Sequence, residues 1–432
     1  MNRLVIFILL LFILNQCSYN ENSSIWNKKE KELVITKNIK KILSEEKKVT
    51  TEFNQGLKLD LVKIRSNNKI VDNKNHYGPQ NYNGSLKKIG KYKFTNLDNI
   101  KKLNFKPLFL DDGLVFFDNK GTIIRYDGKQ KVKWKINHYL KSEKKLKPRL
   151  SFALVDENLI ITDNIAKYYS VNITNGELNW LKDNDYPFNS EIKNNKNKFF
   201  VVDYKNTLRC YNINDGSECW SLQTEDSFTI SDSKLSLIII DDKVVFSNTI
   251  GDITGVDIET GLIAWQLPTQ SSDIINETYN FEISKLVSDG ESIFFSNNRN
   301  EFYSMDVRTG TVNWINEINS NLTPIIYDNL IFTVSNDGYL HIIDKDKGNI
   351  IRITDLYVNY KIKKRNVIRP IGFTLGNTKL YLTNTDGKMI VADLALGNVV
   401  DIKKISGSFI SRPFIYNQNL FVVKNGSIVQ YN

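Results

Sequence analysis

The sequence has few of the residues that most often carry enzyme chemistry. It contains three histidines and three cysteines in 432 residues. His76, His138 and His341 stand far apart, without the spacing that metal ligands show. No Gly-x-Ser-x-Gly nucleophile motif and no Gly-rich phosphate loop is present. The sequence therefore gives no support to a metal-dependent enzyme, a serine hydrolase or a nucleotide-binding site of this kind.

The charged residues do not gather into a basic face. The net charge is +10, but the cations are spread along the chain and do not alternate with aromatic residues as they do in nucleic-acid sites. We therefore expect no nucleic-acid partner. The basic stretches 141–147 and 361–365 are interpreted as solvated loops between structural units, and contact with lipid headgroups or an acidic partner is the alternative.

The N-terminus has the features of a targeting signal. An apolar run at residues 4–14 follows Arg3; it is short for a membrane span and has the length of a signal-peptide core. The next residues, Leu-Asn-Gln-Cys, resemble a bacterial lipobox, with Gln16 in place of the usual small residue. We predict a lipoprotein signal peptide at residues 1–16 and lipidation of Cys17, with plain secretion or an uncleaved anchor as alternatives. Ser18 is compatible with transfer to the outer membrane.

Residues 17–84 are predicted to be a tether. They are rich in charged and polar residues and contain runs such as Lys-Lys-Glu-Lys-Glu at 28–32. Such a segment buries too little apolar surface to offset the conformational entropy that it would lose on folding. The tether would let the folded part of the chain stand away from the membrane.

From about residue 85 onward the chain repeats, with a period of about 40 to 50 residues that is typical of solenoids and propellers. The most regular feature is a short apolar strand that follows a polar turn. Eight such strands are predicted, at residues 114–117, 159–162, 199–202, 244–247, 293–296, 330–334, 380–383 and 420–423.

A second feature of the repeat is a turn with an aromatic residue at a fixed offset. An Asp or Asn lies four residues before a Gly, which favours a tight turn because the side chain caps it and Gly accepts a positive φ. The residue four positions after the Gly is Trp in four copies, and a looser first copy also has a Trp; the residues are Trp134, Trp180, Trp220, Trp265 and Trp314. Two weaker copies have Arg352 and Asp401 at this position. We predict that each Trp packs against the turn of the neighbouring unit.

Four short strands per repeat predict an all-β, eight-bladed β-propeller over residues 85–432, with four antiparallel strands in each blade. The last unit, residues 408–431, has room for three strands. We expect its fourth strand to come from residues 87–94, so that the N-terminal strand joins the last blade and closes the ring without a free edge.

The Asp-x-x-Thr-Gly-x-x-x-Trp repeat resembles that of the pyrroloquinoline-quinone-like propellers. With the lipobox and the tether, the chain resembles the BamB family, the lipoprotein subunits of the outer-membrane β-barrel assembly machinery. The resemblance implies a non-catalytic scaffold without cofactor or metal, held by a lipid anchor at the periplasmic face of the outer membrane. Its implied partners are BamA, the other subunits of the complex and unfolded outer-membrane protein precursors.

The resemblance also suggests contact residues for BamA. In this family, loops between blades on one face bind the partner. By position, the matching residues here are Phe228, Ile230 and Ser231 in one loop and Asn280 and Glu282 in the next. Ser231 replaces the Arg of the family pattern and Asn280 replaces one Asp, so an Arg–carboxylate contact is weakened or rerouted. The alternative is that these are ordinary loop residues.

Two other functions are compatible with a propeller. A quinoprotein dehydrogenase needs a quinone, a Ca²⁺ ion held by carboxylate and amide oxygens, and a catalytic Asp. This chain lacks the adjacent cysteine pair usual in such enzymes, and its Asp pairs fall in predicted turns. The other alternative is a propeller that binds a different ligand at the cell surface.

Cys210 and Cys219 flank the turn at residues 214–216 and are therefore expected on adjacent strands of one hairpin. Two packed thiols are one interpretation. A cross-strand disulfide is the alternative, because an oxidising periplasm permits it.

Overall fold

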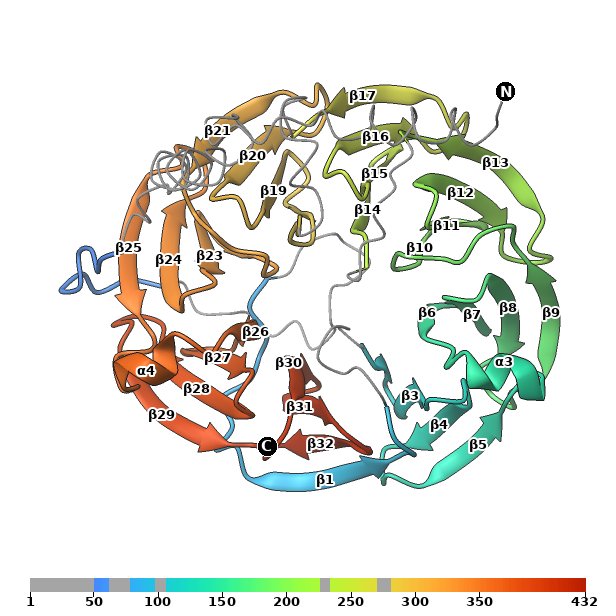
Figure 1. Ribbon diagram of the computed structural model, residues 1–432, viewed down its shortest axis with the longest axis horizontal. Helices are drawn as coiled ribbons and strands as arrows, with labels where there is room; N and C mark the ends of the chain where they lie inside the picture. The colour runs from blue at the N-terminus through green and yellow to red at the C-terminus, as the bar shows by residue number, and fades with distance from the viewer. Residues whose placement is uncertain (1–49, 62–77, 98–105, 226–233, 270–280) are drawn as a thin grey trace, which may run out of the picture. The chain divides into compact units, whose positions relative to one another are not determined.

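Eight four-stranded antiparallel sheets stand around a common axis in the computed structural model (Figure 1). The structure describes residues 50–61, 78–97, 106–225, 234–269 and 281–432. The ring belongs to a compact unit that runs from Thr51 to Asn432. The prediction of an all-β, eight-bladed propeller with four antiparallel strands per blade is confirmed.

Blades 1 to 4 follow one another along the chain, each with its first strand innermost. Blade 1 consists of β2 (Leu108–Leu110), β3 (Gly113–Phe117), β4 (Ile123–Asp127) and β5 (Val132–Ile136). Blade 2 consists of β6 (Leu150–Val155), β7 (Asn158–Asp163), β8 (Lys167–Asn172) and β9 (Leu178–Asp183). Blade 3 consists of β10 (Lys193–Asn195), β11 (Lys198–Val202), β12 (Thr207–Asn212) and β13 (Glu218–Gln223). Blade 4 consists of β14 (Leu237–Ile240), β15 (Lys243–Ser247), β16 (Ile253–Asp257) and β17 (Ile263–Leu267).

Blades 5 to 7 repeat this order, and blade 8 departs from it. Blade 5 consists of β18 (Val287–Ser288), β19 (Ser292–Ser296), β20 (Phe302–Asp306) and β21 (Val312–Asn316). Blade 6 consists of β22 (Ile325–Tyr327), β23 (Leu330–Val334), β24 (Tyr339–Asp344) and β25 (Ile350–Asp355). Blade 7 consists of β26 (Pro370–Leu375), β27 (Lys379–Asn384), β28 (Lys388–Asp393) and β29 (Val399–Lys404). Blade 8 consists of β30 (Ile410–Tyr416), β31 (Asn419–Lys424), β32 (Ser427–Tyr431) and β1 (Lys88–Lys93).

The second strand of each blade is buried along nearly its whole length, as in β15, where four of five residues are buried. A strand covered on both faces reads as a continuous apolar run, whereas the outer strand β17 is mostly exposed. The hydrophobic core is therefore divided into clusters that lie between adjacent blades. In one of them, Val245 of blade 4 packs with Phe295 and Met305 of blade 5.

The antiparallel order gives the ring two different faces. Turns between the first and second strands and between the third and fourth strands lie at one end of each sheet; we call this the turn face. Turns between the second and third strands, and all connections between blades, lie at the other end, which we call the loop face. Two connections on the loop face carry short helices, α3 (Lys141–Lys145) between blades 1 and 2 and α4 (Ile362–Arg365) between blades 6 and 7.

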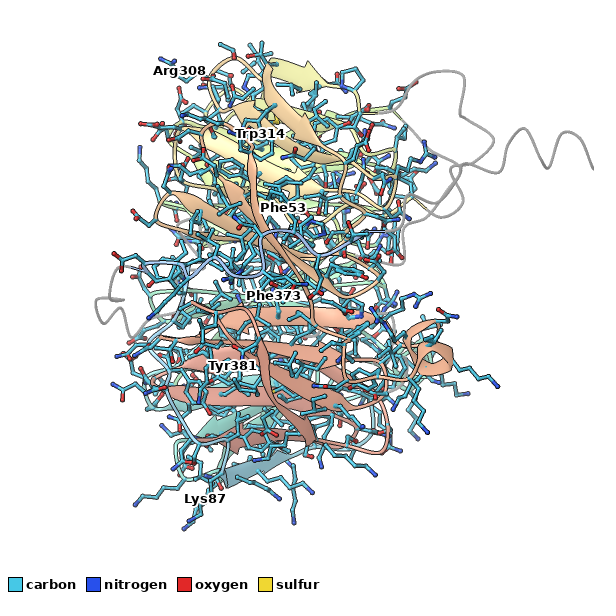
Figure 2. The ribbon with its side chains drawn as sticks, turned by 90° about the vertical axis from the view of Figure 1, so that its left-hand side faces the viewer. Phe53, Lys87, Arg308, Trp314, Phe373 and Tyr381 are labelled. Atoms are coloured by element: carbon cyan, nitrogen blue, oxygen red, sulfur yellow. The ribbon has the colours of Figure 1, made fainter. Side chains whose placement is uncertain are left out.

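The propeller unit begins earlier than residue 85. Residues 51–61, the N-terminal segment, pack on blades 6 and 7: Phe53 forms an antiparallel bridge with Ile353 of β25, and the Leu59 amide donates to the Ala395 carbonyl over 3.0 Å. Phe53 lies along the outer strand of blade 6 (Figure 2). Part of the stretch interpreted as tether is thus fixed to the ring, because a free strand edge accepts an additional segment.

Blade 8 combines three strands from the C-terminal end of the propeller with β1 from its N-terminal end. β1 pairs antiparallel with β32, from Lys93 opposite Ser427 to Lys88 opposite Tyr431, with an irregularity between Lys88 and Gly90.

Among the described residues, the structure has no helix long and apolar enough to cross a bilayer.

Candidate functional site

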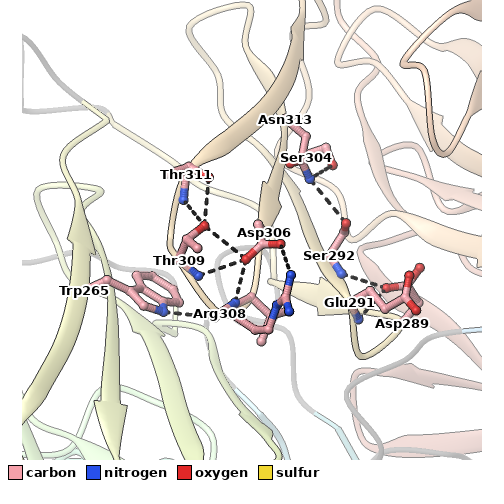
Figure 3. A network of polar contacts seen from close by, with 11 residues as sticks. Trp265, Asp289, Glu291, Ser292, Ser304, Asp306, Arg308, Thr309, Thr311 and Asn313 are labelled. Carbon is pink, nitrogen blue, oxygen red and sulfur yellow. Dashed lines mark hydrogen bonds and ion pairs between the residues drawn. The ribbon is translucent and has the colours of Figure 1, made fainter.

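The Asp–Gly turn of each repeat is held by the side chain that begins it. In blade 5, one carboxylate oxygen of Asp306 accepts the backbone amides of Arg308 and Thr309, each over 2.9 Å, and the Thr309 hydroxyl over 3.0 Å (Figure 3). The pKa of Asp306 is lowered, chiefly by the amide of Thr309. The turn therefore uses its carboxylate for structure, and this group is not available as a proton donor near neutral pH.

The Trp of each repeat contacts the turn of the next blade. The Trp265 indole donates to the Val307 carbonyl over 2.9 Å, directly after Asp306 (Figure 3). A Cβ atom at Gly310 would lie 2.6 Å from this indole, and Gly310 has a φ of 71°, so glycine is required there on both counts. Equivalent bonds join Trp134 to Ile173, Trp180 to Ile213, Trp220 to Ile258 and Trp314 to Lys345.

Arg352 takes the place of the Trp in blade 6. Its guanidinium donates to the Leu394 carbonyl over 2.8 Å. The equivalent carbonyl in the blades that have a Trp neighbour accepts an indole N–H. It also donates to the carbonyls of Ala395 and Leu57, over 2.6 and 2.8 Å. Arg352 thus joins blades 6 and 7 and fixes the N-terminal segment to both. The repeat pattern marks Arg352 as a weaker copy of the Trp position. The signal for its role is that arginine, like tryptophan, carries an N–H donor.

The suggested partner-contact residues lie in the connections between blades 3 and 4 and between blades 4 and 5. Glu282 is exposed on the loop face. Its amide donates to the Asn298 side chain over 3.1 Å, and its carboxylate accepts the Asn321 side chain. The remaining suggested residues, Phe228, Ile230, Ser231 and Asn280, lie outside the described residues, and so does Cys17, for which lipidation is predicted.

Cys210 and Cys219 are both free thiols in the structure, one buried and one exposed. Cys210 faces Trp220 in the ladder, and a bulge between Cys210 and Tyr211 leaves Cys219 without a direct partner in the register. Burial raises the pKa of the Cys210 thiol, with a further contribution from hydrogen bonding to Cys219. Cys210 is therefore a poor nucleophile in this state.

Cations gather at the propeller axis. Lys285 bonds Glu191, and because blades 5 and 3 are not neighbours this contact lies at the axis. Lys234 reaches from blade 4 to the Ser151 hydroxyl of blade 2 over 2.5 Å, and burial lowers its pKa to about 8. In the part of the chain that the structure describes, no group of three or more His, Cys, Asp or Glu side chains could hold a metal. These residues do not fit a calcium-bound quinone.

One cleft of about 410 Å³ opens beside blade 3. Its lining residues are Tyr186, Lys205, Thr207, Arg209, Ser221 and Gln223. Arg209 is engaged by Asp203 over 2.8 Å and by Glu218 over 2.9 Å. The lining contains no carboxylate and no histidine. Together, the eight sheets and the indole-to-turn contacts define a β-propeller of the pyrroloquinoline-quinone-like repeat class.

Comparison with known proteins identifies the family. The family model described as outer membrane protein assembly factor BamB matches residues 119–354. This is more than half of the chain, and the protein belongs to that family. A curated relative, the outer membrane protein assembly factor BamB of Shewanella oneidensis, is 22% identical over 256 residues, which are 56% of this chain and 60% of the relative.

Solved structures show the same fold at low sequence identity. The crystal structure of BamB from Moraxella catarrhalis superposes with a TM-score of 0.64 at 15% identity, covering 80% of this chain and 99% of that one. A quinohemoprotein alcohol dehydrogenase from Comamonas testosteroni superposes with a TM-score of 0.61 at 9% identity, covering 82% and 78%. The propeller alone therefore does not separate scaffold from enzyme, and the distinction rests on the family and on the axis residues.

Proposed function

We propose that the protein is a non-catalytic scaffold of the outer-membrane protein assembly complex. It binds the periplasmic domains of the barrel insertase BamA and assists the insertion of β-barrel proteins into the outer membrane. The observation that carries this proposal is membership of the BamB family. The cations at the axis and the structural use of the turn carboxylates add support against an enzyme.

The ring suits a scaffold because it fixes the geometry of its loops. From blade 1 to blade 7, each blade is joined to the next along the chain through an indole or a guanidinium, so connections on the loop face are held at set distances from one another. We propose that Phe228, Ile230, Ser231, Asn280 and Glu282 contact BamA from two successive connections. Residues 1–16 are proposed as the signal peptide, and lipidated Cys17 as the anchor that keeps the protein at the periplasmic face of the outer membrane.

Affinity purification after mild cross-linking of the native envelope tests the partner. We expect the tagged protein to recover the barrel insertase and its companion lipoproteins. Glu282→Lys reverses a charge on the loop face and should reduce that recovery. Glu291→Lys is the matched control, since Glu291 is exposed in a turn on the opposite face. Equal recovery with both variants would remove Glu282 from the contact, and absence of the insertase with the unaltered protein would overturn the proposed function.

We further propose that the pairing of β1 with β32 closes the ring. Tyr92 of β1 is 3% exposed and stacks edge-on against Tyr126 of blade 1. The Tyr126 hydroxyl donates to the Lys93 carbonyl over 2.5 Å. Tyr92→Ala is expected to speed amide hydrogen exchange in β32, while amide exchange in blades 3 to 5 stays unchanged. Ile89→Ala, at an exposed position of β1, is the control; equal effects of both variants would contradict a closing role.

A further inference from the structure

Two connections on the loop face, those that carry α3 and α4, expose aliphatic side chains to solvent. Around α3, Leu140 is 68% exposed and Leu146 is 62% exposed. Around α4, Ile362 is 78% exposed and Val367 is 75% exposed. Both short helices have no buried residue. These four side chains therefore contribute little to the stability of the ring.

The same connections are strongly basic. Residues 141–147 contain four lysines and one acidic residue, and residues 361–369 contain three lysines, two arginines and no acidic residue. Some of these cations form ion pairs within the fold: Lys364 pairs with Asp386 over 3.0 Å, and Arg365 pairs with Asp355 over 2.6 Å. Four exposed lysines have no ion pair within the described part of the chain; they are Lys141, Lys145, Lys361 and Lys363.

The chain that precedes the ring joins it on the same face. The Asp355 amide, at the loop-face end of β25, donates to the Glu52 carboxylate over 3.1 Å. The Asp355 side chain holds Arg365 of α4. The N-terminal segment therefore begins beside α4, which projects from the right-hand side of the ring in Figure 2. Any anchor at Cys17 reaches the propeller through this point of the loop face.

Exposed aliphatic residues surrounded by lysines match the surface of an anionic bilayer. Aliphatic side chains enter the boundary between headgroups and acyl chains, while the lysine ammonium groups stay among the anionic headgroups. A protein partner is less well matched, because protein interfaces are depleted in lysine and enriched in aromatic residues. α3 and α4 flank the arc of blades 7, 8 and 1, whereas the proposed BamA contacts lie between blades 3 and 5.

We propose that the α3 and α4 connections form a second membrane contact, in which Leu140, Leu146, Ile362 and Val367 enter an anionic lipid surface and the neighbouring lysines bind its headgroups. The inference rests on the proposed function to the extent that the anchor brings this face to a membrane. With both contacts in place, the arc of blades 7, 8 and 1 faces the bilayer and the arc of blades 3 to 5 remains open to the insertase.

Hydrogen exchange of the full-length protein on vesicles tests this contact. We expect the amides of residues 140–147 and 358–367 to exchange several-fold more slowly on phosphatidylethanolamine vesicles that contain phosphatidylglycerol than on phosphatidylcholine vesicles. High salt should reverse the protection, because each lysine near the surface contributes about fivefold to affinity through screened electrostatics. Equal exchange on the two kinds of vesicle would overturn the proposal and leave these connections to a protein partner.

A pair of matched variants makes the test specific. Changing Leu140, Leu146, Ile362 and Val367 together to serine should abolish the protection. Changing four exposed aliphatic residues of the turn face to serine is the control and should preserve it; these residues are Val132, Leu178, Leu262 and Leu396. Protection that survives in the loop-face variant would also overturn the proposal. The mass of the N-terminal peptide reports lipidation of Cys17 separately, so a missing anchor is distinguished from a missing loop contact.

Discussion

Replacing Trp265 with alanine is expected to lower the free energy of unfolding by about 3–5 kcal/mol, as truncation of buried aromatic residues does. Trp265 is 8% exposed, lies over Gly310 of the next blade and donates its indole N–H to Val307. The substitution leaves a cavity between blades 4 and 5 and an unpaired carbonyl in the turn. Denaturant unfolding followed by circular dichroism gives the change in free energy.

Two further variants separate the packing of the Trp265 ring from its hydrogen bond and provide a control. Trp265→Phe keeps part of the ring packing but removes the donor, and should cost less than the alanine variant. Ile263→Ala, in the same strand but 47% exposed, should change stability by no more than about 0.5 kcal/mol. An unchanged unfolding curve for Trp265→Ala would show that the indole does not hold the blades together.

Replacing Arg352 with alanine is expected to destabilise the ring by about 2–6 kcal/mol and to release the N-terminal segment. The carbonyls of Leu57 and Leu394 would lose their donor, and each buried polar group left unpaired costs about 1–3 kcal/mol. The Ala395 carbonyl would keep the Leu59 amide as its one remaining donor. Limited proteolysis should then cut within residues 51–61 earlier than in the unaltered protein. Denaturant unfolding measures the stability.

Arg352→Trp separates the two roles of this residue. An indole at this position is expected to restore the contact with Leu394 that other blades make, but it has no donors for Ala395 and Leu57. Ring stability should then recover in part while residues 51–61 stay open to protease. Arg308→Ala, whose side chain is 85% exposed in a turn, is the control and should change neither property. Resistance of residues 51–61 to protease in Arg352→Ala would contradict the clamping role.

Much of the ring could be predicted because its strongest signals are local. The second strands are covered on both faces and leave continuous apolar runs, and the Asp–Gly turns depend on side chains within a few residues of each other. The innermost strands gave no comparable signal. β18 has two residues, and its position is set by the neighbouring blades rather than by its own sequence.

The N-terminal segment could not be predicted because its partners are distant in the chain. Leu57 and Arg352 are separated by 295 positions. Residues 51–61 have a composition that suits a tether, and the free edge of β25, the guanidinium of Arg352 and the Ala395 carbonyl give them a fixed place. Of the suggested BamA contacts, the structure describes Glu282, on the loop face. The family resemblance suggested it, and the local pattern gave no separate signal for it.

The docking of the N-terminal segment also has a mechanical consequence. The segment runs antiparallel to β25 and leaves it at the loop face, next to Asp355. A pull directed away from that face along the strand loads the Phe53 bonds, the Leu59 bond and the Arg352 bond to Leu57 at the same time, in shear. Bonds loaded in parallel resist more force than bonds that open one after another. If the proposed anchor at Cys17 holds the protein to a membrane, drag on the propeller is therefore carried by the interface of blades 6 and 7, and not by the pairing of β1 with β32.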